Sequence, residues 1–225
     1  RNVEALAASG RRVLVPDLPG CGDSARPPGG QDADVIVPPL AAGLRQLAGD
    51  QPCDLVGFSF GGLVATLLAA AHPEQVRRLV LMGAPGLGLR SRRLPVSNWR
   101  HAPDAEARLA AHRRNLQVWM LHRPEAIDAL AVGIQAANVP RDRLLRRRLA
   151  LTELLKETLP RLVCRVDAIY GEQDSLYREH YDKLRPALAQ APRFSELVFV
   201  PDAGHWLQYE QAERVNRELV RLLAS

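Results

Sequence analysis

A serine within a glycine-flanked turn is the first residue of this sequence that suggests chemistry. Ser59 is the centre of Gly57-Phe58-Ser59-Phe60-Gly61, a G-x-S-x-G motif that follows an apolar run and precedes an Ala/Leu-rich stretch. In that strand–turn–helix context the hydroxyl stands above a sheet, at a helix N-terminus whose dipole favours developing negative charge. Small residues are expected on both sides of the serine because the backbone of so tight a turn is crowded. We therefore predict that Ser59 is a nucleophile and that the N–H of Phe60 is an oxyanion donor.

A base and an acid that could serve this nucleophile follow later in the chain. A serine needs a base to remove its proton, and the base needs an acid to orient it. His205, in "PDAGHW", follows the last apolar run, and Asp174, in "IYGEQDS", follows the run before it. The predicted catalytic residues are thus Ser59, Asp174 and His205, each at the end of a different strand. Asp202 is a competing acid, but three residues before His205 it is interpreted as shaping the turn. The other histidines are expected at helix ends, in helices or in loops away from strand ends: His72, His101, His112, His122 and His180.

Short apolar runs that alternate with helices are expected to position these side chains. Runs that are apolar throughout are typical of a parallel sheet buried on both faces, which makes the predicted fold class α/β. Helical composition follows the serine, and helical spacing of apolar residues closes the chain. The predicted helices are Leu63–Ala71 and Gln211–Leu223, and the predicted strands are Val13–Pro16, Cys53–Phe58, Leu79–Met82, Val166–Tyr170 and Leu197–Val200.

The middle of the chain interrupts this alternation. Three helices are predicted there, Asp104–Leu116, Pro124–Asn138 and Arg141–Thr158, with Asp104 as an N-cap and Pro124 in a first helical turn. Because strands resume afterwards with the same character, the segment is interpreted as a helical lid inserted into the strand–helix core. The predicted domains are residues 1–85 and 163–225 for the two parts of the core and 86–162 for the lid.

Composition and charge limit the classes of function. The chain has 225 residues, of which 47% are hydrophobic and 24% charged, so general disorder is excluded. The net charge of +5 comes from one segment: residues 90–165 contain 16 Lys or Arg against 7 Asp or Glu. That segment has no RNA-binding or zinc-finger signature, so nucleic acid is not an expected partner. We interpret it, including Arg146-Arg147-Arg148, as a solvated helical face; the alternative is a field that attracts an anionic substrate.

Cysteine usage and hydropathy bear on location. The three cysteines, Cys21, Cys53 and Cys164, have neither zinc-site spacing nor an even number for disulfides, so a reducing, cytoplasmic compartment is expected. No apolar run approaches the roughly 18 residues that span a membrane, and no leader peptide is recognised. No membrane partner is therefore predicted.

Taken together, the motifs resemble the α/β-hydrolase fold family over nearly the whole chain. "VPDLPGCGDS", "LVGFSFGG", "HPEQVRRLVLMGAPG", "IYGEQD" and "AGHWLQYEQAERVN" are similar to successive blocks of that family, in the same order. The resemblance implies a mostly parallel sheet between helices, acyl transfer to water, a small-molecule substrate, and no metal or organic cofactor. It leaves esters, lactones and thioesters open as substrates. Phe58 and Trp206, next to the nucleophile and the base, are the candidate substrate-binding residues, although Trp206 equally suits packing under the lid.

One branch of the family is a particular alternative. Gly204-His205-Trp206 and Glu210 resemble carbon–carbon bond hydrolases that act on meta-cleavage products of aromatic rings, and a basic lid would suit their acidic dienone substrates. The residue before the nucleophile, however, is Phe58, where those enzymes have a polar asparagine. An apolar side chain cannot help to position a dienolate, so ester or lactone hydrolysis is the preferred prediction.

A further departure concerns the start of the chain. Family members have an H-G-rich loop that supplies a second oxyanion N–H, and no His-Gly pair precedes Ser59. The resemblance therefore predicts a chain that is truncated before Arg1 or naturally shortened. The strands that would be missing leave a sheet edge that can pair with another chain, so a homo-oligomer is an option. The alternative outside the enzymes is a binding protein that keeps the fold without a full oxyanion site.

Overall fold

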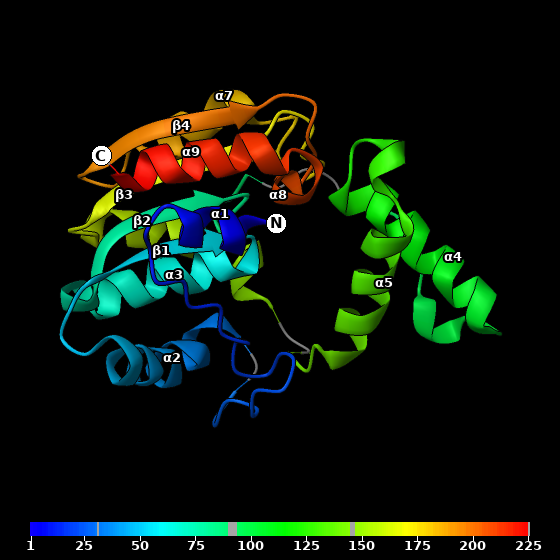
Figure 1. Ribbon diagram of the computed structural model, residues 1–225, viewed down its shortest axis with the longest axis horizontal. Helices are drawn as coiled ribbons and strands as arrows, with labels where there is room; N and C mark the ends of the chain where they lie inside the picture. Colours follow the sequence, from blue (N-terminus) through cyan, green and yellow to red (C-terminus); the bar gives the residue numbers. More distant parts are fainter. Residues whose placement is uncertain (31, 90–93, 145–146, 225) are drawn as a thin grey trace.

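A four-stranded parallel sheet forms the centre of the protein (Figure 1). The computed structural model describes residues 1–30, 32–89, 94–144 and 147–224. The strands run in the order of the sequence. The predicted strand Cys53–Phe58 is confirmed with the same bounds, and the three later strands are confirmed with wider bounds. They are β1 (Cys53–Phe58), β2 (Val76–Met82), β3 (Arg165–Gly171) and β4 (Phe194–Val200).

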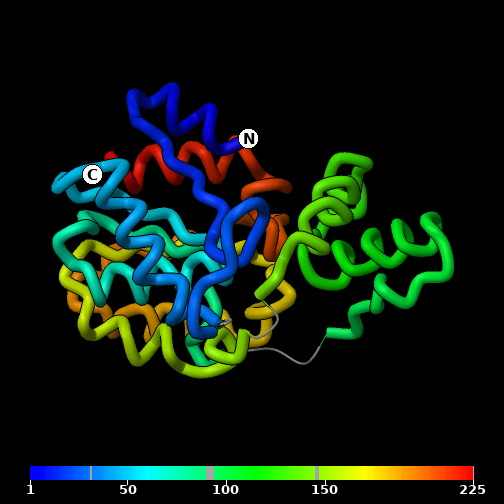
Figure 2. Tube along the Cα trace, turned by 90° about the horizontal axis from the view of Figure 1, so that it is seen from below, coloured from blue at the N-terminus to red at the C-terminus, as the bar shows by residue number. Residues whose placement is uncertain are grey.

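Helices cover both faces of this sheet, as the apolar runs predict. In β2, Leu79 and Leu81 face one hydrophobic cluster while Val80 and Met82 face another, which is the alternation of side chains along a strand. The first cluster is completed by α2 (Ala33–Ala48), α3 (Phe60–Ala71) and α7 (Tyr181–Leu188), and the second mainly by α9 (Ala212–Ala224). Figure 2 shows α9 together with α1 (Asn2–Ala8) on one side of the molecule.

The predicted strand Val13–Pro16 is wrong. These residues carry no strand assignment, and Leu14 and Val15 are 38% and 72% exposed. A strand needs a hydrogen-bonding neighbour as well as an apolar run, and within the described residues β2 is the only strand that pairs with β1. The outer edge of β1 is accordingly open, and Val56 on this strand is 38% exposed.

A pair of helices stands apart from the sheet, at the right of Figure 1. We call residues 105–138 the helical arm: α4 (Ala105–Asn115), the π-helical turn η3 (Leu116–Met120), the 3-10 turn η4 (Pro124–Ala126) and α5 (Ala129–Asn138). Asp104 caps α4 as predicted, by accepting from Ala107 N. The predicted helix Pro124–Asn138 is divided instead, because Asp128 leaves the helix and caps α5 by accepting from Ala131 N.

The predicted helix Arg141–Thr158 is also wrong. Only short turns and one short helix occur there, η6 (Leu149–Leu151), α6 (Leu154–Thr158) and η7 (Leu159–Arg161), and residues 145–146 lie outside the described residues. Three leucines of this region are buried in the main core beside α3: Leu155, Leu159 and Leu162. The chain folds back so that they pack there, and it does not continue as one long helix. The division into core and lid stays a prediction, with the helical arm as its projecting part. The remaining elements are η1 (Pro73–Gln75), η2 (Trp99–His101), η5 (Val139–Arg141) and α8 (Leu207–Glu210).

Candidate active site

Ser59 lies in a sharp turn between β1 and α3. Its φ angle is +48°, a left-handed conformation that costs energy in a non-glycine residue and is typical of strained functional sites. The backbone around Ser59 is crowded, as expected, but the glycine needed after the serine is not the predicted one. A Cβ on Gly57 would lie 2.6 Å from Gly62 Cα, and one on Gly62 would lie 2.5 Å from Ala84 Cβ, whereas one on Gly61 would meet no atom within 4 Å. The close packing therefore needs Gly57 and Gly62.

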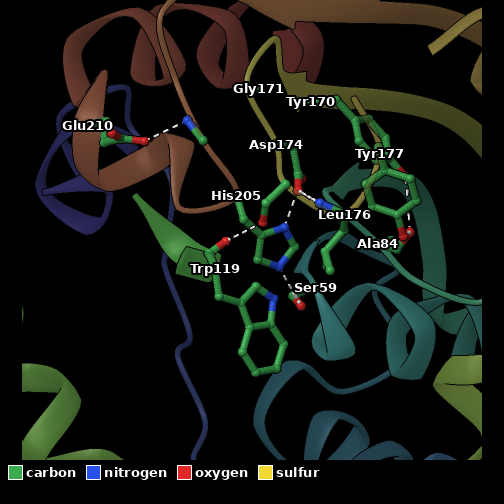
Figure 3. A network of polar contacts seen from close by, with 12 residues as sticks. Ser59, Ala84, Trp119, Tyr170, Gly171, Asp174, Leu176, Tyr177, His205 and Glu210 are labelled. Carbon is green, nitrogen blue, oxygen red and sulfur yellow. Dashed lines mark hydrogen bonds and ion pairs between the residues drawn. The ribbon is translucent and has the colours of Figure 1, made fainter. Parts of the chain in front are cut away.

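The three residues predicted as a triad lie side by side (Figure 3). The Ser59 Oγ is 2.9 Å from His205 Nε2, and His205 Nδ1 is 2.8 Å from Asp174 Oδ2. His205 and Asp174 are only 1% and 0% exposed, so solvent barely screens their interaction. With Nδ1 donating to the carboxylate, Nε2 is free to accept from the serine hydroxyl. This is the arrangement that a general base requires.

The loop after β3 holds Asp174 in place through backbone and phenol contacts. Its second oxygen, Oδ1, accepts from Leu176 N at 2.9 Å. The Asp174 N–H donates to the Tyr181 hydroxyl at 3.0 Å, and that hydroxyl donates to Gly171 O at 2.8 Å. Burial and the nearby Asp174 charge raise the pKa of Tyr181, which keeps the phenol protonated and able to donate. Sequence reasoning missed Tyr181, because nothing in the spacing of the chain distinguishes it from a core aromatic residue.

Two further tyrosines beneath the site were also missed. Tyr170 and Tyr177 both donate to Ala84 O, at 3.1 and 2.8 Å, and their rings meet edge to face with centroids 5.1 Å apart. Burial, and then the Asp174 charge, raise the pKa of Tyr170. These bonds fix the end of β2 against the loop that carries Asp174.

The candidate substrate-binding residues have different surroundings. The centroid of the Phe58 ring is 5.0 Å from that of His205, so Phe58 packs against the imidazole. Trp206 stacks on Tyr209 with centroids 4.7 Å apart. The competing acid Asp202 is 59% exposed at its side chain, adopts a φ of +53° and makes ion pairs at 3.6 Å with His122 and Arg123. It is therefore a turn residue, as interpreted from the sequence.

A tryptophan of the helical arm borders the site. In Figure 3 the indole of Trp119 points to the side where Ser59 and His205 meet, and it is 39% exposed. Its carbonyl accepts from the Ser175 hydroxyl at 2.8 Å, next to Asp174. Trp119 belongs to the π-helical turn η3, a rare element that is common at functional sites.

One member of the arginine run does not lie on a solvated face. The guanidinium carbon of Arg147 is 4.5 Å from the centre of the Phe60 ring, and the side chain pairs with Asp142 at 2.5 Å. The expectation of a solvated helical face is wrong for this residue, because Arg147 is not in a helix and its half-buried side chain contacts Asp142 and Phe60. Arg148 is exposed as expected, and Arg146 lies outside the described residues. A half-buried cation thus lies beside Phe60, the residue that follows Ser59.

Among the residues that the structure describes, no three His, Cys, Asp or Glu side chains gather as ligands for a metal ion. None of the helices in the described ranges is long and apolar enough to cross a membrane.

Comparisons with known proteins agree with this geometry. The family model described as "Alpha/beta hydrolase family" matches residues 1–218. A 2-hydroxymuconate semialdehyde hydrolase from Pseudomonas putida is 32% identical over 232 residues, which cover 95% of this chain and 77% of that protein.

Solved structures show the same fold at lower identity. The meta-cleavage product hydrolase CumD from Pseudomonas fluorescens IP01 is similar with a TM-score of 0.75 and 23% identity, over 99% of this chain and 83% of that one. An esterase from Thermogutta terrifontis is similar with a TM-score of 0.69 and 21% identity, again over 99% and 83%. A parallel sheet that carries a serine at the strand-to-helix turn, together with a family match over almost every residue, makes this chain an enzyme of the α/β-hydrolase family.

Proposed function

We propose that the protein is a serine hydrolase that cleaves an ester, a lactone or a similarly activated carbonyl in a small hydrophobic substrate. The observation that supports it most is the continuous line of hydrogen bonds from Ser59 Oγ through His205 to Asp174. In this geometry His205 can remove the proton of Ser59 while the serine oxygen attacks a carbonyl carbon. Phe58, against the base, and Trp119, beside it, would provide apolar walls for the substrate.

The reaction proceeds in two halves. His205 Nε2 takes the proton of Ser59 while Oγ bonds to the carbonyl carbon, and the same nitrogen then gives that proton to the leaving group as an acyl–Ser59 forms. Water attacks the acyl group with His205 again as the base, and the acid product leaves as Oγ regains its proton. Asp174 keeps the imidazole in the required tautomer and stabilises its cation.

The oxyanion formed in both halves needs hydrogen-bond donors. Phe60 is the first residue of α3, where the N–H groups of the first turn have no partner within the helix. The N–H of Phe60 is therefore the proposed donor, supported by the helix dipole.

A second candidate is hydrolysis of a carbon–carbon bond in an acidic dienone. A relative from Burkholderia cepacia is named as a 2-hydroxy-6-oxo-6-phenylhexa-2,4-dienoate hydrolase, which is a substrate of this class. Arg147 supplies a cation beside Phe60 that suits a substrate carboxylate. In this reaction the same triad would act at a ketone: the oxygen of water ends on the carbonyl carbon, which leaves as a carboxylic acid. The bond from that carbon to the dienol chain breaks, and the chain carbon takes up a proton.

The first experiment is intact-mass spectrometry after treatment with a fluorophosphonate. One adduct on the parent chain, none on Ser59→Ala and one on the control Ser195→Ala would support an activated Ser59. Ser195 is a matched control because it is an exposed serine of β4. A folded parent that gains no adduct would contradict the proposal and favour a binding protein with the same fold.

The two substrate classes are then separated by direct assay. A neutral phenyl ester and a 2-hydroxy-6-oxo-dienoate are each offered to the parent and to Ser59→Ala. The class with the higher kcat/KM, abolished in Ser59→Ala, identifies the reaction.

A further inference from the structure

Glu210, in the short helix α8 after the base, connects two loops that are far apart in the sequence. Its Oε2 accepts from Gly204 N at 2.6 Å, one residue before His205 (Figure 3). Its Oε1 accepts from His122 N at 2.8 Å and from Arg123 N at 2.7 Å, within the helical arm. Burial raises the pKa of this carboxyl group, against the lowering effect of the three N–H donors.

The two loops touch along their backbones. A Cβ on Gly204 would lie 2.8 Å from His122 N and 3.0 Å from Met120 O, so only a glycine permits this approach. On the other side of His205, Trp206 N donates to Met120 O at 2.7 Å. Trp206 is therefore bound directly to Met120, and Gly204 is joined to His122 and Arg123 through Glu210, so a shift of residues 120–123 would move the imidazole.

Contacts beyond the carboxylate extend this connection into the arm. Tyr209, the residue before Glu210, is part of the hydrophobic cluster that α5 and η3 form. Its hydroxyl donates to Asp128 at 2.6 Å, and Asp128 caps α5. The arm is thus mounted on the loop that carries the base, and Glu210 lies at the junction.

We propose that Glu210 is a positioning residue that couples the helical arm to His205, by holding the Gly204 N–H and the His122 and Arg123 N–H groups on opposite oxygens of one carboxylate. This inference rests on the proposed function, because it assumes that His205 is the base. It adds a residue outside the triad through which movement of the arm alters the rate of acylation.

Only a carboxylate suits this position. Both of its oxygens accept from N–H groups, whereas an amide has one oxygen and an NH₂ group that donates. In Glu210→Gln, whichever way the amide turns, its NH₂ faces an N–H donor and one loop is released. Glu210→Asp keeps both acceptors but is one methylene shorter, so it cannot reach both loops. Buried N–H groups left without an acceptor are costly, which drives the released loop away.

The first test uses the unmodified protein and needs no activity. Hydrogen exchange of the backbone amides of Gly204, His122 and Arg123 is followed by NMR. We expect all three to be protected, with similar opening free energies because one carboxylate holds them. Exchange at the rate of an unstructured peptide at any of the three would overturn the proposal.

The second test compares Glu210→Gln and Glu210→Asp with the control Glu213→Gln, an exposed residue of α9 that undergoes the same loss of charge. Fluorophosphonate inactivation gives the rate at saturation and the concentration at half-saturation. We expect the Glu210 variants to lose at least about tenfold in the saturating rate, since small misplacements of reacting groups are expensive. The half-saturating concentration should change less than about threefold, and Glu213→Gln should match the parent.

Hydrogen exchange of the same variants separates positioning from general destabilisation. Peptides covering residues 119–128 and 203–209 should exchange faster together, while β3 exchanges as in the parent. A saturating rate within about twofold of the parent, or loosening of only one of the two peptides, would overturn the coupling. A parent that does not react with the fluorophosphonate would instead overturn the proposed function, and exchange would still decide whether Glu210 joins the two loops.

Discussion

Gly62, in the first turn of α3, lies so close to Ala84 that a Cβ on the glycine would be 2.5 Å from the Cβ of the alanine. The contact joins the helix that starts at the nucleophile to the chain just beyond β2. A methyl group there would force α3 away from the sheet and shift Ser59 with it.

We therefore expect Gly62→Ala to lower the free energy of unfolding by about 1–3 kcal/mol, the usual cost of overpacking a core. Gly61→Ala is the matched control, because the added methyl group meets no atom within 4 Å. That variant should be neutral or more stable by up to about 1 kcal/mol, since alanine favours a helix over glycine. Urea unfolding measures both values, and equal effects of the two substitutions would contradict the packing argument.

The role of Asp174 can be separated from that of its competitor. In Asp174→Asn the side chain keeps its shape but favours the wrong tautomer of His205, so kcat should fall by roughly 10⁴-fold. Asp202→Asn changes an exposed turn residue without a contact to the base and should stay within about twofold. Steady-state kinetics on the preferred substrate is the measurement. A comparable fall of kcat in Asp202→Asn would show that Asp174 has been wrongly identified as the acid.

Arg147 should distinguish substrates by charge. Its guanidinium lies over the Phe60 ring, so Arg147→Gln is expected to raise KM for a carboxylate-bearing substrate by about tenfold or more, the loss of one charge-assisted hydrogen bond. For a neutral ester KM should stay nearly constant. Arg148→Gln, at the exposed neighbour, controls for net charge. If Arg147→Gln changed KM by the same factor for both substrates, relative to the parent, the support for an anionic substrate would be lost.

A buried histidine makes the stability of the helical arm depend on pH. His112, in α4, packs against Trp99 with ring centroids 5.3 Å apart, and its Nδ1 has no hydrogen-bond partner among the described residues. Burial, and then the charge of Arg108, lower its pKa below the ordinary 6.5. The unfolded chain therefore binds the proton more tightly than the folded one. Stability is complete above the ordinary pKa and falls as the pH drops through that value towards the lowered one.

Thermal unfolding at about pH 7.5 and about pH 5.5 tests this dependence. The parent should lose more stability on acidification than His112→Leu, which keeps an apolar side chain of similar size and has no proton to bind. Trp fluorescence reports on the arm, because Trp99 and Trp119 flank His112 in the sequence. Parallel losses in both proteins would rule out His112 as the source.

The sheet and the grouping of Ser59, His205 and Asp174 could be predicted from the sequence because both depend on local patterns. The run Leu79–Met82 is apolar throughout, as expected of a strand covered on both faces, and the polar residues that follow β1, β3 and β4 meet at one edge of a parallel sheet. The run Val13–Pro16 has the same pattern but no adjacent strand, and pairing is a property that no single run contains. Likewise α2 was missed because Pro38 and Pro39, inside it, normally indicate a break.

Other parts of the site depend on contacts that sequence spacing does not encode. Glu210 meets His122 across 88 residues, and neither residue type nor local pattern points from one to the other. Arg147 is not in a helix, so the helical spacing assumed for the arginine run did not apply. The helix predicted over Arg141–Thr158 is wrong for a similar reason. The bounds of α6 are determined by its packing on α3 and not by the helix propensity of its residues.

The way in which the helical arm is attached bears on how such an enzyme can be modified. Four of the groups that bind it to the loops of the base and the acid are main-chain atoms: the carbonyls of Trp119 and Met120 and the N–H groups of His122 and Arg123. Substitution leaves main-chain groups in place, so exposed side chains of α4 and η3, such as Leu109 and Trp119, can be varied in combinatorial libraries while the main-chain contacts and the buried Leu116 keep the arm attached. Substrate range can then be selected in these helices without renewed optimisation of the catalytic residues.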